Sequence, residues 1–153
     1  MPDISRSTVS IRLFGAELDP EYLTQSLGCL PSFAAKKGEQ LTKRNGKTRV
    51  VKKGFWRLHL NDGEDNTVPL EEKIELLLGR LTDNLDTWQE ITKDLQVADI
   101  FCGLFIDNWN EGFGLSPAIM KKVSDRNIKI DFDIYSPTNS WYREKEQDES
   151  IDE

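Results

Sequence analysis

Two kinds of apolar periodicity follow one another along this chain and constrain its fold. Residues 8–14 place every second side chain on one face, and residues 128–135 repeat this period of two, which is typical of half-buried strands. Residues 70–81 instead carry apolar side chains at a helical period of about 3.6 residues. We therefore predict an α+β fold with a mainly antiparallel or mixed sheet of five to six strands and helices largely on one face.

The expected helices have clear start signals. Asp19 and Ser116 each precede a proline, and a capping side chain followed by proline is common chemistry at a helix start. Two further helices are expected from Pro69 and after Asn84. Because a strand precedes the cap and proline in both places, a ferredoxin-like arrangement or a duplicated strand–helix unit is plausible. Shared helix-start chemistry explains the echo more simply.

The remaining strands are expected in the middle of the chain. Residues 47–60 are predicted to form two strands with a turn or bulge at Gly54. Trp56 shares a face with Leu58 in the second strand, which favours a place in the core. Residues 97–106 are almost continuously apolar, as expected for a strand near the centre of a sheet covered on both faces.

The length and the C-terminal composition predict the domain organisation. A chain of 153 residues suits one domain, which we place at residues 1–142. Residues 143–153 contain six acids, two bases and one large apolar side chain, Ile151, and so predict a mobile acidic tail.

Cysteine content and hydropathy bear on localisation. No apolar run approaches the roughly 20 residues that cross a bilayer, and residues 1–15 lack the pattern of a secretory signal. We therefore expect a cytoplasmic protein without a membrane partner, in which Cys29 and Cys102 are reduced thiols.

The charge distribution is strongly uneven. The chain has a net charge of −7, yet residues 36–57 hold nine Lys and Arg against one acid, Glu39. The simplest explanation of this stretch is a solvated basic hairpin. The second is a surface that binds an anionic protein partner. Nucleic-acid binding is less favoured, because a net-acidic protein repels a polyanion. The predicted binding residues are Lys36, Lys37, Lys43, Arg44, Lys47, Arg49, Trp56 and Trp109.

No catalytic constellation stands out. A single histidine, His59, excludes histidine-rich zinc sites, and Asp131 and Asp133 fit the solvent face of a strand, so we expect neither a metal nor a cofactor. Trp109 follows the apolar strand in a glycine-containing loop and could line a pocket with Asp107 and His59.

Three functional hypotheses remain. The leading one is a non-catalytic module that binds a macromolecule, most simply a protein. The alternatives are a small-ligand binder or uncharacterised enzyme with a pocket near Trp109, and nucleic-acid binding through residues 36–57.

Several short motifs, in their order and spacing, resemble the bacterial domain-of-unknown-function family 4279 over roughly residues 8–136. They include Ser10–Gly15, Leu18–Pro20, Gly54–Trp56, Phe101–Gly103 and Leu115–Pro117. The resemblance implies a small bacterial cytoplasmic protein, without an activity to carry over. On a shared functional surface the matching polar and aromatic residues would be Lys37, Glu39 and Trp56. By analogy, small acidic α+β proteins of this kind sometimes act as immunity proteins that neutralise a toxin.

Overall fold

The computed structural model describes residues 4, 6–61 and 67–136. In chain order the elements are β1 (Arg6–Gly15), α1 (Pro20–Leu27), β2 (Phe33–Ala35), β3 (Gln40–Thr42), β4 (Thr48–Val50), β5 (Gly54–His59), α2 (Leu70–Gly79), α3 (Leu85–Thr92), β6 (Val97–Phe105), α4 (Pro117–Asp125) and β7 (Lys129–Tyr135).

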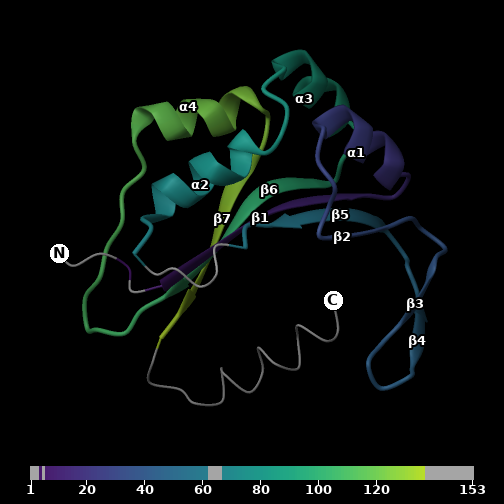
Figure 1. The fold of residues 1–153 in the computed structure, drawn as a ribbon, viewed down its shortest axis with the longest axis horizontal. Coiled ribbons are helices and arrows are strands. Elements are labelled where there is room, and N and C mark those ends of the chain that lie inside the picture. The colour runs from purple at the N-terminus through teal and green to yellow at the C-terminus, as the bar shows by residue number, and fades with distance from the viewer. Residues whose placement is uncertain (1–3, 5, 62–66, 137–153) are drawn as a thin grey trace.

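The strands form two sheets, as Figure 1 shows. The larger one has the order β2-β5-β1-β6-β7, and β3 and β4 form a separate hairpin. β1 lies at the centre and is antiparallel to both β5 and β6, whereas β6 and β7 are parallel. A parallel pair needs a crossover connection, which α4 provides between β6 and β7. The predicted mixed α+β architecture is confirmed.

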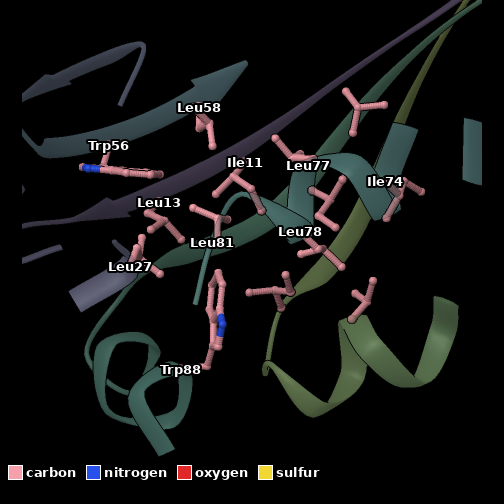
Figure 2. Close-up of a cluster of buried hydrophobic side chains, with 14 of the residues drawn as sticks. Ile11, Leu13, Leu27, Trp56, Leu58, Ile74, Leu77, Leu78, Leu81 and Trp88 are labelled. Atoms are coloured by element: carbon pink, nitrogen blue, oxygen red, sulfur yellow. The ribbon is translucent and has the colours of Figure 1, made fainter. Parts of the chain in front are cut away.

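The four described helices lie on one face of the larger sheet (Figure 1). The side chains of Ile11, Leu13 and Leu58 point from the strands toward these helices and are fully or almost fully buried. Trp56 and Trp88 complete this core, and Figure 2 shows side chains from strands and helices converging there. Each such side chain contributes about 1.5–3 kcal/mol through burial, so the helix-facing side of the sheet carries most of the stability.

The predicted helix starts are confirmed. The Asp19 carboxylate accepts a hydrogen bond from the backbone N–H of Glu21 at 3.2 Å, and the Ser116 hydroxyl accepts one from the backbone N–H of Ile119 at 3.3 Å. α1 ends at Gly28, whose φ of 71° is the left-handed conformation that glycine adopts most readily.

The other face of the sheet corrects one expectation. We expected the apolar strand at residues 97–106 to be covered on both sides, yet no described helix covers its outer face. Instead, arginine side chains from β1 cover the aromatic rings of β6. The guanidinium of Arg12 lies 4.2 Å from the ring centroid of Phe101, and that of Arg6 lies 3.8 Å from the ring centroid of Phe105.

The two strands expected at residues 47–60 are present as β4 and β5. β4 and β5 do not pair with each other, because β4 pairs with β3 across a turn that contains Gly46. Gly54 begins β5 and allows close packing, since a Cβ atom there would lie 3.0 Å from Leu18.

The two strand–helix units, β1 with α1 and β6 with α4, differ in how their strands pair with a later strand of the sheet. β1 pairs antiparallel with β5, whereas β6 pairs parallel with β7. Because α2 and α3 separate β5 from β6, the element order differs from the β-α-β-β-α-β order of ferredoxin-like domains. The acidic tail predicted at residues 143–153 lies outside the described residues. None of the described helices combines the length and apolar character required to cross a bilayer.

Candidate functional site

A hollow of about 650 Å³ lies between the β3–β4 hairpin and the outer face of the sheet. We call it the basic hollow, because four cationic side chains line it: Arg49, Lys52, Lys53 and Arg57. Its apolar part consists of Phe14, Val50, Val51 and Phe55. The hairpin, the link that follows it and two strands of the sheet therefore build one site.

Strand pairing places the aromatic part of the basic hollow. Phe14 on β1 and Phe55 on β5 are register partners, and their ring centroids lie 6.3 Å apart. The Arg57 guanidinium lies 5.1 Å from the ring centroid of Phe14 and 5.8 Å from that of Phe55. Attraction between a cation and the ring faces holds this arginine beside the aromatic surface. The hollow thus offers apolar contact and positive charge at the same place.

The electrostatics of the basic hollow contrast with those of the whole chain. Although the net charge is −7, no carboxylate is among the described residues that line the hollow. Lys52 and Lys53 are exposed, while Arg49 and Arg57 are half-buried. Positive charges gathered around a concave surface attract an anion and raise its local concentration. The arrangement suits a ligand that carries carboxylates or phosphates next to an apolar group.

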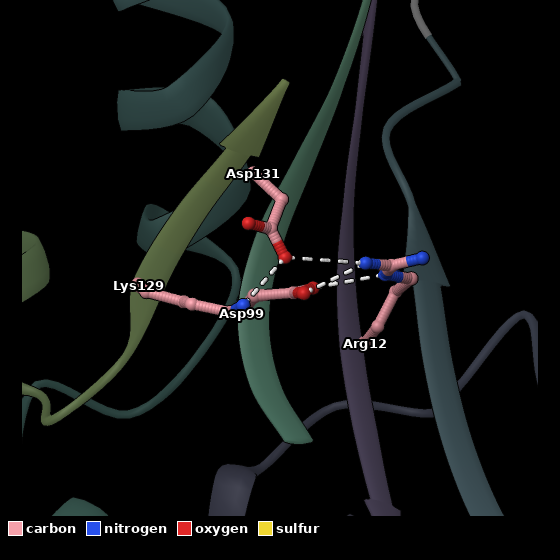
Figure 3. A network of polar contacts seen from close by, with 4 residues as sticks. All are labelled: Arg12, Asp99, Lys129 and Asp131. Carbon is pink, nitrogen blue, oxygen red and sulfur yellow. Dashed lines mark hydrogen bonds and ion pairs between the residues drawn. The ribbon is translucent and has the colours of Figure 1, made fainter. Parts of the chain in front are cut away.

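A second polar cluster lies further along the same face of the sheet (Figure 3). The Arg12 guanidinium donates two hydrogen bonds to the Asp99 carboxylate, at 2.9 and 2.7 Å, and lies 3.5 Å from the Asp131 carboxylate. Lys129 lies 3.0 Å from Asp131. The side chain of Asp99 is completely buried, whereas that of Asp131 is 35% exposed.

The two carboxylates of this cluster have opposite pKa shifts. Burial raises the pKa of Asp99 above its ordinary value, although the hydrogen bonds from Arg12 oppose this effect. Hydrogen bonds to Asp99 and Lys129 lower the pKa of Asp131. Within residues 4, 6–61 and 67–136, no three His, Cys, Asp or Glu side chains gather as a metal site. The cluster therefore acts as an electrostatic tie between β1, β6 and β7.

A family model described as Domain of unknown function (DUF4279) matches residues 5–137. The chain belongs to this family. The match confirms the resemblance seen in the sequence and covers every element from β1 to β7, including the hairpin that borders the basic hollow. No curated protein and no solved structure matched this DUF4279 chain.

The predicted binding residues of the DUF4279 domain fall into separate places. Of the basic ones, only Arg49 lines the basic hollow. Lys43, Arg44 and Lys47 lie at the turn of the hairpin, where the Lys43 N–H donates to the Lys47 carbonyl at 2.7 Å. Lys36 and Lys37 lie in the link between β2 and β3. The hairpin therefore displays basic residues at its turn and, separately, along the hollow.

Trp56 has a structural place in the DUF4279 domain. Its side chain is fully buried, and its indole N–H donates to the Thr24 hydroxyl at 3.1 Å. This confirms the core position expected from its strand face. Because it presents no surface, it does not contribute to the basic hollow.

The loop with Trp109 is remote from His59 in the sheet. Trp109 is fully exposed, and the neighbouring Asp107 N–H donates to the Glu111 carboxylate at 3.2 Å. The His59 ring instead lies 5.8 Å from that of Phe33, beyond β1 in strand order. A separate hollow of about 510 Å³ touches this loop but is lined by other residues, including Phe113, Ser116 and Glu71. The described residues thus do not join Trp109, Asp107 and His59 in one pocket.

Most residues of the basic hollow are not among the binding residues predicted from the sequence. Lys52, Lys53 and Arg57 belong to the basic stretch, but Phe14 lies far from it in sequence. Its alternation in β1 placed it opposite the core, and an apolar residue on that face was a usable signal. Phe55 belongs to the basic stretch, and only the register of β1 and β5 shows that Phe14 lies beside it.

Proposed function

We propose that this DUF4279 domain is a non-catalytic binding module that docks an acidic surface of a partner protein in its basic hollow. One observation carries the proposal: four cationic residues and two phenylalanines line the same hollow in a chain whose net charge is −7. Aromatic and arginine side chains in a concave surface are the groups that contribute most to protein interfaces.

A protein fits this site better than a nucleic acid. A long polyanion would also meet the acidic remainder of a chain whose net charge is −7. An acidic patch on a folded protein presents its charges locally and avoids that repulsion. The finer form of the proposal, in which the partner is a toxin, rests only on the analogy with acidic immunity proteins.

A bacterial cytoplasmic setting belongs to the same proposal. Cys29 and Cys102 are both free thiols, and free thiols fit a reducing compartment. The bacterial origin is inferred from the resemblance of the sequence to a bacterial family.

The test is a pull-down at low salt from a lysate of the native host. The immobilised baits are the wild-type protein and two charge-reversed variants. Lys52→Glu with Lys53→Glu reverses the charge at the basic hollow. Lys121→Glu with Lys122→Glu makes the same charge change on α4, on the helix-covered side. We expect wild type and the α4 variant to retain one stoichiometric acidic protein, which salt releases, and the hollow variant to lose it.

Two results would contradict this function. A partner retained equally by the hollow variant would place the interface elsewhere on the domain. Nucleic acid, detected by its absorbance and lost on the same charge reversal, would favour the third hypothesis instead.

A further inference from the structure

The basic hollow is bordered by the edge of a strand. Three consecutive residues line the hollow: Arg49 and Val50 at the end of β4, and Val51 directly after it. Successive side chains of a strand point to opposite faces, so a surface that one face formed would involve only alternate residues. No described residue of β3 lines the hollow. The hollow therefore lies along the edge of β4 that faces away from β3.

On this edge the backbone N–H and C=O of Val50 point outward. The Val51 N–H donates to the Glu39 carbonyl at 2.8 Å, and the Lys43 N–H donates to the Lys47 carbonyl at 2.7 Å. In an antiparallel pair, hydrogen-bonded residue pairs alternate with pairs whose N–H and C=O groups point away from the partner strand. Val50, paired with Gln40 between these bonds, is of the second kind. Within the part of the chain that the structure describes, β4 pairs with no strand other than β3.

We infer that the acidic partner binds as an extended segment that pairs with β4 as the third strand of the hairpin sheet. This inference rests on the proposed function and specifies its ligand. Main-chain hydrogen bonds to an exposed edge supply affinity in this mode, and alternate side chains supply specificity. Acidic side chains of the segment meet Lys52 and Lys53, and an apolar or aromatic side chain between them meets the rings of Phe14 and Phe55.

The edge of β7 offers no comparable selectivity. β7 is the outer strand of the larger sheet, and it alternates Lys129 with Asp131 and Asp133 on one face. These mixed charges favour no single kind of partner. Positive charge, apolar surface and an outward-pointing backbone coincide at β4.

Two proline variants separate strand pairing from general attraction. Proline removes a backbone N–H and is tolerated at a sheet edge where that N–H points outward. Val50→Pro removes an outward N–H on the side of the basic hollow. Thr42→Pro removes the equivalent N–H on the opposite edge, because Thr42 and Thr48 are also a pair of the outward-pointing kind. Both changes remove an outward-pointing backbone N–H, and Val50→Pro additionally replaces a side chain that lines the basic hollow.

The probe is a set of peptides selected from a random displayed library against the wild-type protein, then labelled and titrated by fluorescence anisotropy. We expect acidic sequences with an apolar or aromatic residue between acids. Val50→Pro should weaken their binding about fivefold or more, the equivalent of one main-chain hydrogen bond. Thr42→Pro should leave the affinity unchanged, and Lys52→Glu with Lys53→Glu should abolish binding.

The outcomes distinguish this inference from the proposed function. If Val50→Pro binds as tightly as wild type while the lysine variant fails, strand pairing is overturned and the basic hollow remains the site. The same holds if no acidic peptide is selected but a folded partner still depends on Lys52 and Lys53. If the lysine variant binds everything normally, both proposals fail. Should Val50→Pro not fold, peptides methylated at alternate backbone nitrogens remove the reciprocal hydrogen bonds, which the peptide N–H groups donate to carbonyl oxygens along β4. Undiminished binding of these peptides would overturn the inference.

Discussion

Arg12 on β1 and Asp99 on β6 are register partners, and two hydrogen bonds of 2.9 and 2.7 Å join their side chains on the outer face of the sheet. The Asp99 side chain is fully buried, whereas that of Arg12 is 24% exposed. The same guanidinium lies 4.2 Å from the centroid of the Phe101 ring. One arginine therefore both neutralises a buried carboxylate and covers an aromatic ring that would otherwise meet water.

Removing only one member of this pair should be costly. We expect Arg12→Leu to lower the free energy of unfolding by about 3–5 kcal/mol, because it leaves the buried Asp99 carboxylate without this guanidinium. Arg12→Leu with Asp99→Leu should recover most of that loss, since an apolar pair avoids the cost of burying charge. Urea unfolding of both single variants and the double variant measures the coupling energy. If Arg12→Leu lowers the free energy of unfolding by less than about 1 kcal/mol, the pair behaves energetically like a solvent-exposed salt bridge, which contradicts this prediction.

The Asp131 carboxylate should make part of the stability depend on pH. Its pKa lies below the ordinary value of 3.8, so its contribution is fully present above that value and is lost as pH falls through the lower folded pKa. We expect Asp131→Asn to be less stable than wild type near neutral pH, with the difference shrinking below about 3.8. Asp99 acts with the opposite sign, because a raised pKa makes the cost of its charge disappear as pH falls. Urea titrations across the acidic range measure the difference, and a gap that widens on acidification would contradict this assignment.

The two cysteines should differ sharply in reactivity. Burial raises the pKa of the Cys102 thiol to about 12, and its side chain is inaccessible, whereas Cys29 is half-buried. We expect a thiol reagent to modify one cysteine in the folded protein, Cys29, and both after unfolding. Cys29→Ser should remove the native reaction. Rapid native labelling of Cys102 in that variant would require an opening of the core.

Gly103 on β6 should not tolerate a side chain. A Cβ atom there would lie 2.6 Å from the Thr8 hydroxyl and 3.6 Å from the Phe105 ring, which stacks on Tyr135 at a centroid distance of 4.9 Å. We expect Gly103→Ala to destabilise the fold by about 1–3 kcal/mol through this overpacking.

Gly79 provides the matched control for this change. A Cβ atom at the end of α2 would meet nothing within 4 Å, so Gly79→Ala should be neutral or stabilise the protein by up to about 1 kcal/mol. Thermal unfolding compares the two variants. Equal effects at both glycines would show that the contact at Thr8 carries no strain.

Local patterns predicted the elements because each pattern has a local cause. The alternation that buries Val9 and Ile11 in β1 and the caps at Asp19 and Ser116 depend on neighbours in sequence. For the same reason the core position of Trp56 was accessible from its strand face.

Pairing between distant segments could not be predicted in the same way. Nothing near residue 50 specifies that β4 pairs with β3 and not with β5, and nothing near Arg12 specifies Asp99, which is 87 positions away. The prediction of the candidate site was affected most, because the site depends on pairing between distant strands. The basic stretch was visible, but Phe14 entered the site only through its register with Phe55. Trp109 shows the reverse case, because an aromatic residue beside glycines suggested a pocket and proved fully exposed.

The hairpin is tied to the domain chiefly at its base. The Gly38 N–H donates to the Val51 carbonyl at 2.8 Å, and the Val51 side chain is buried, but no residue of the described core cluster comes from positions 39–50. A different hairpin grafted between Gly38 and Val51 would thus leave the core untouched. Under the proposed function it would change only one wall of the basic hollow, because Phe14, Phe55 and Arg57 belong to the sheet.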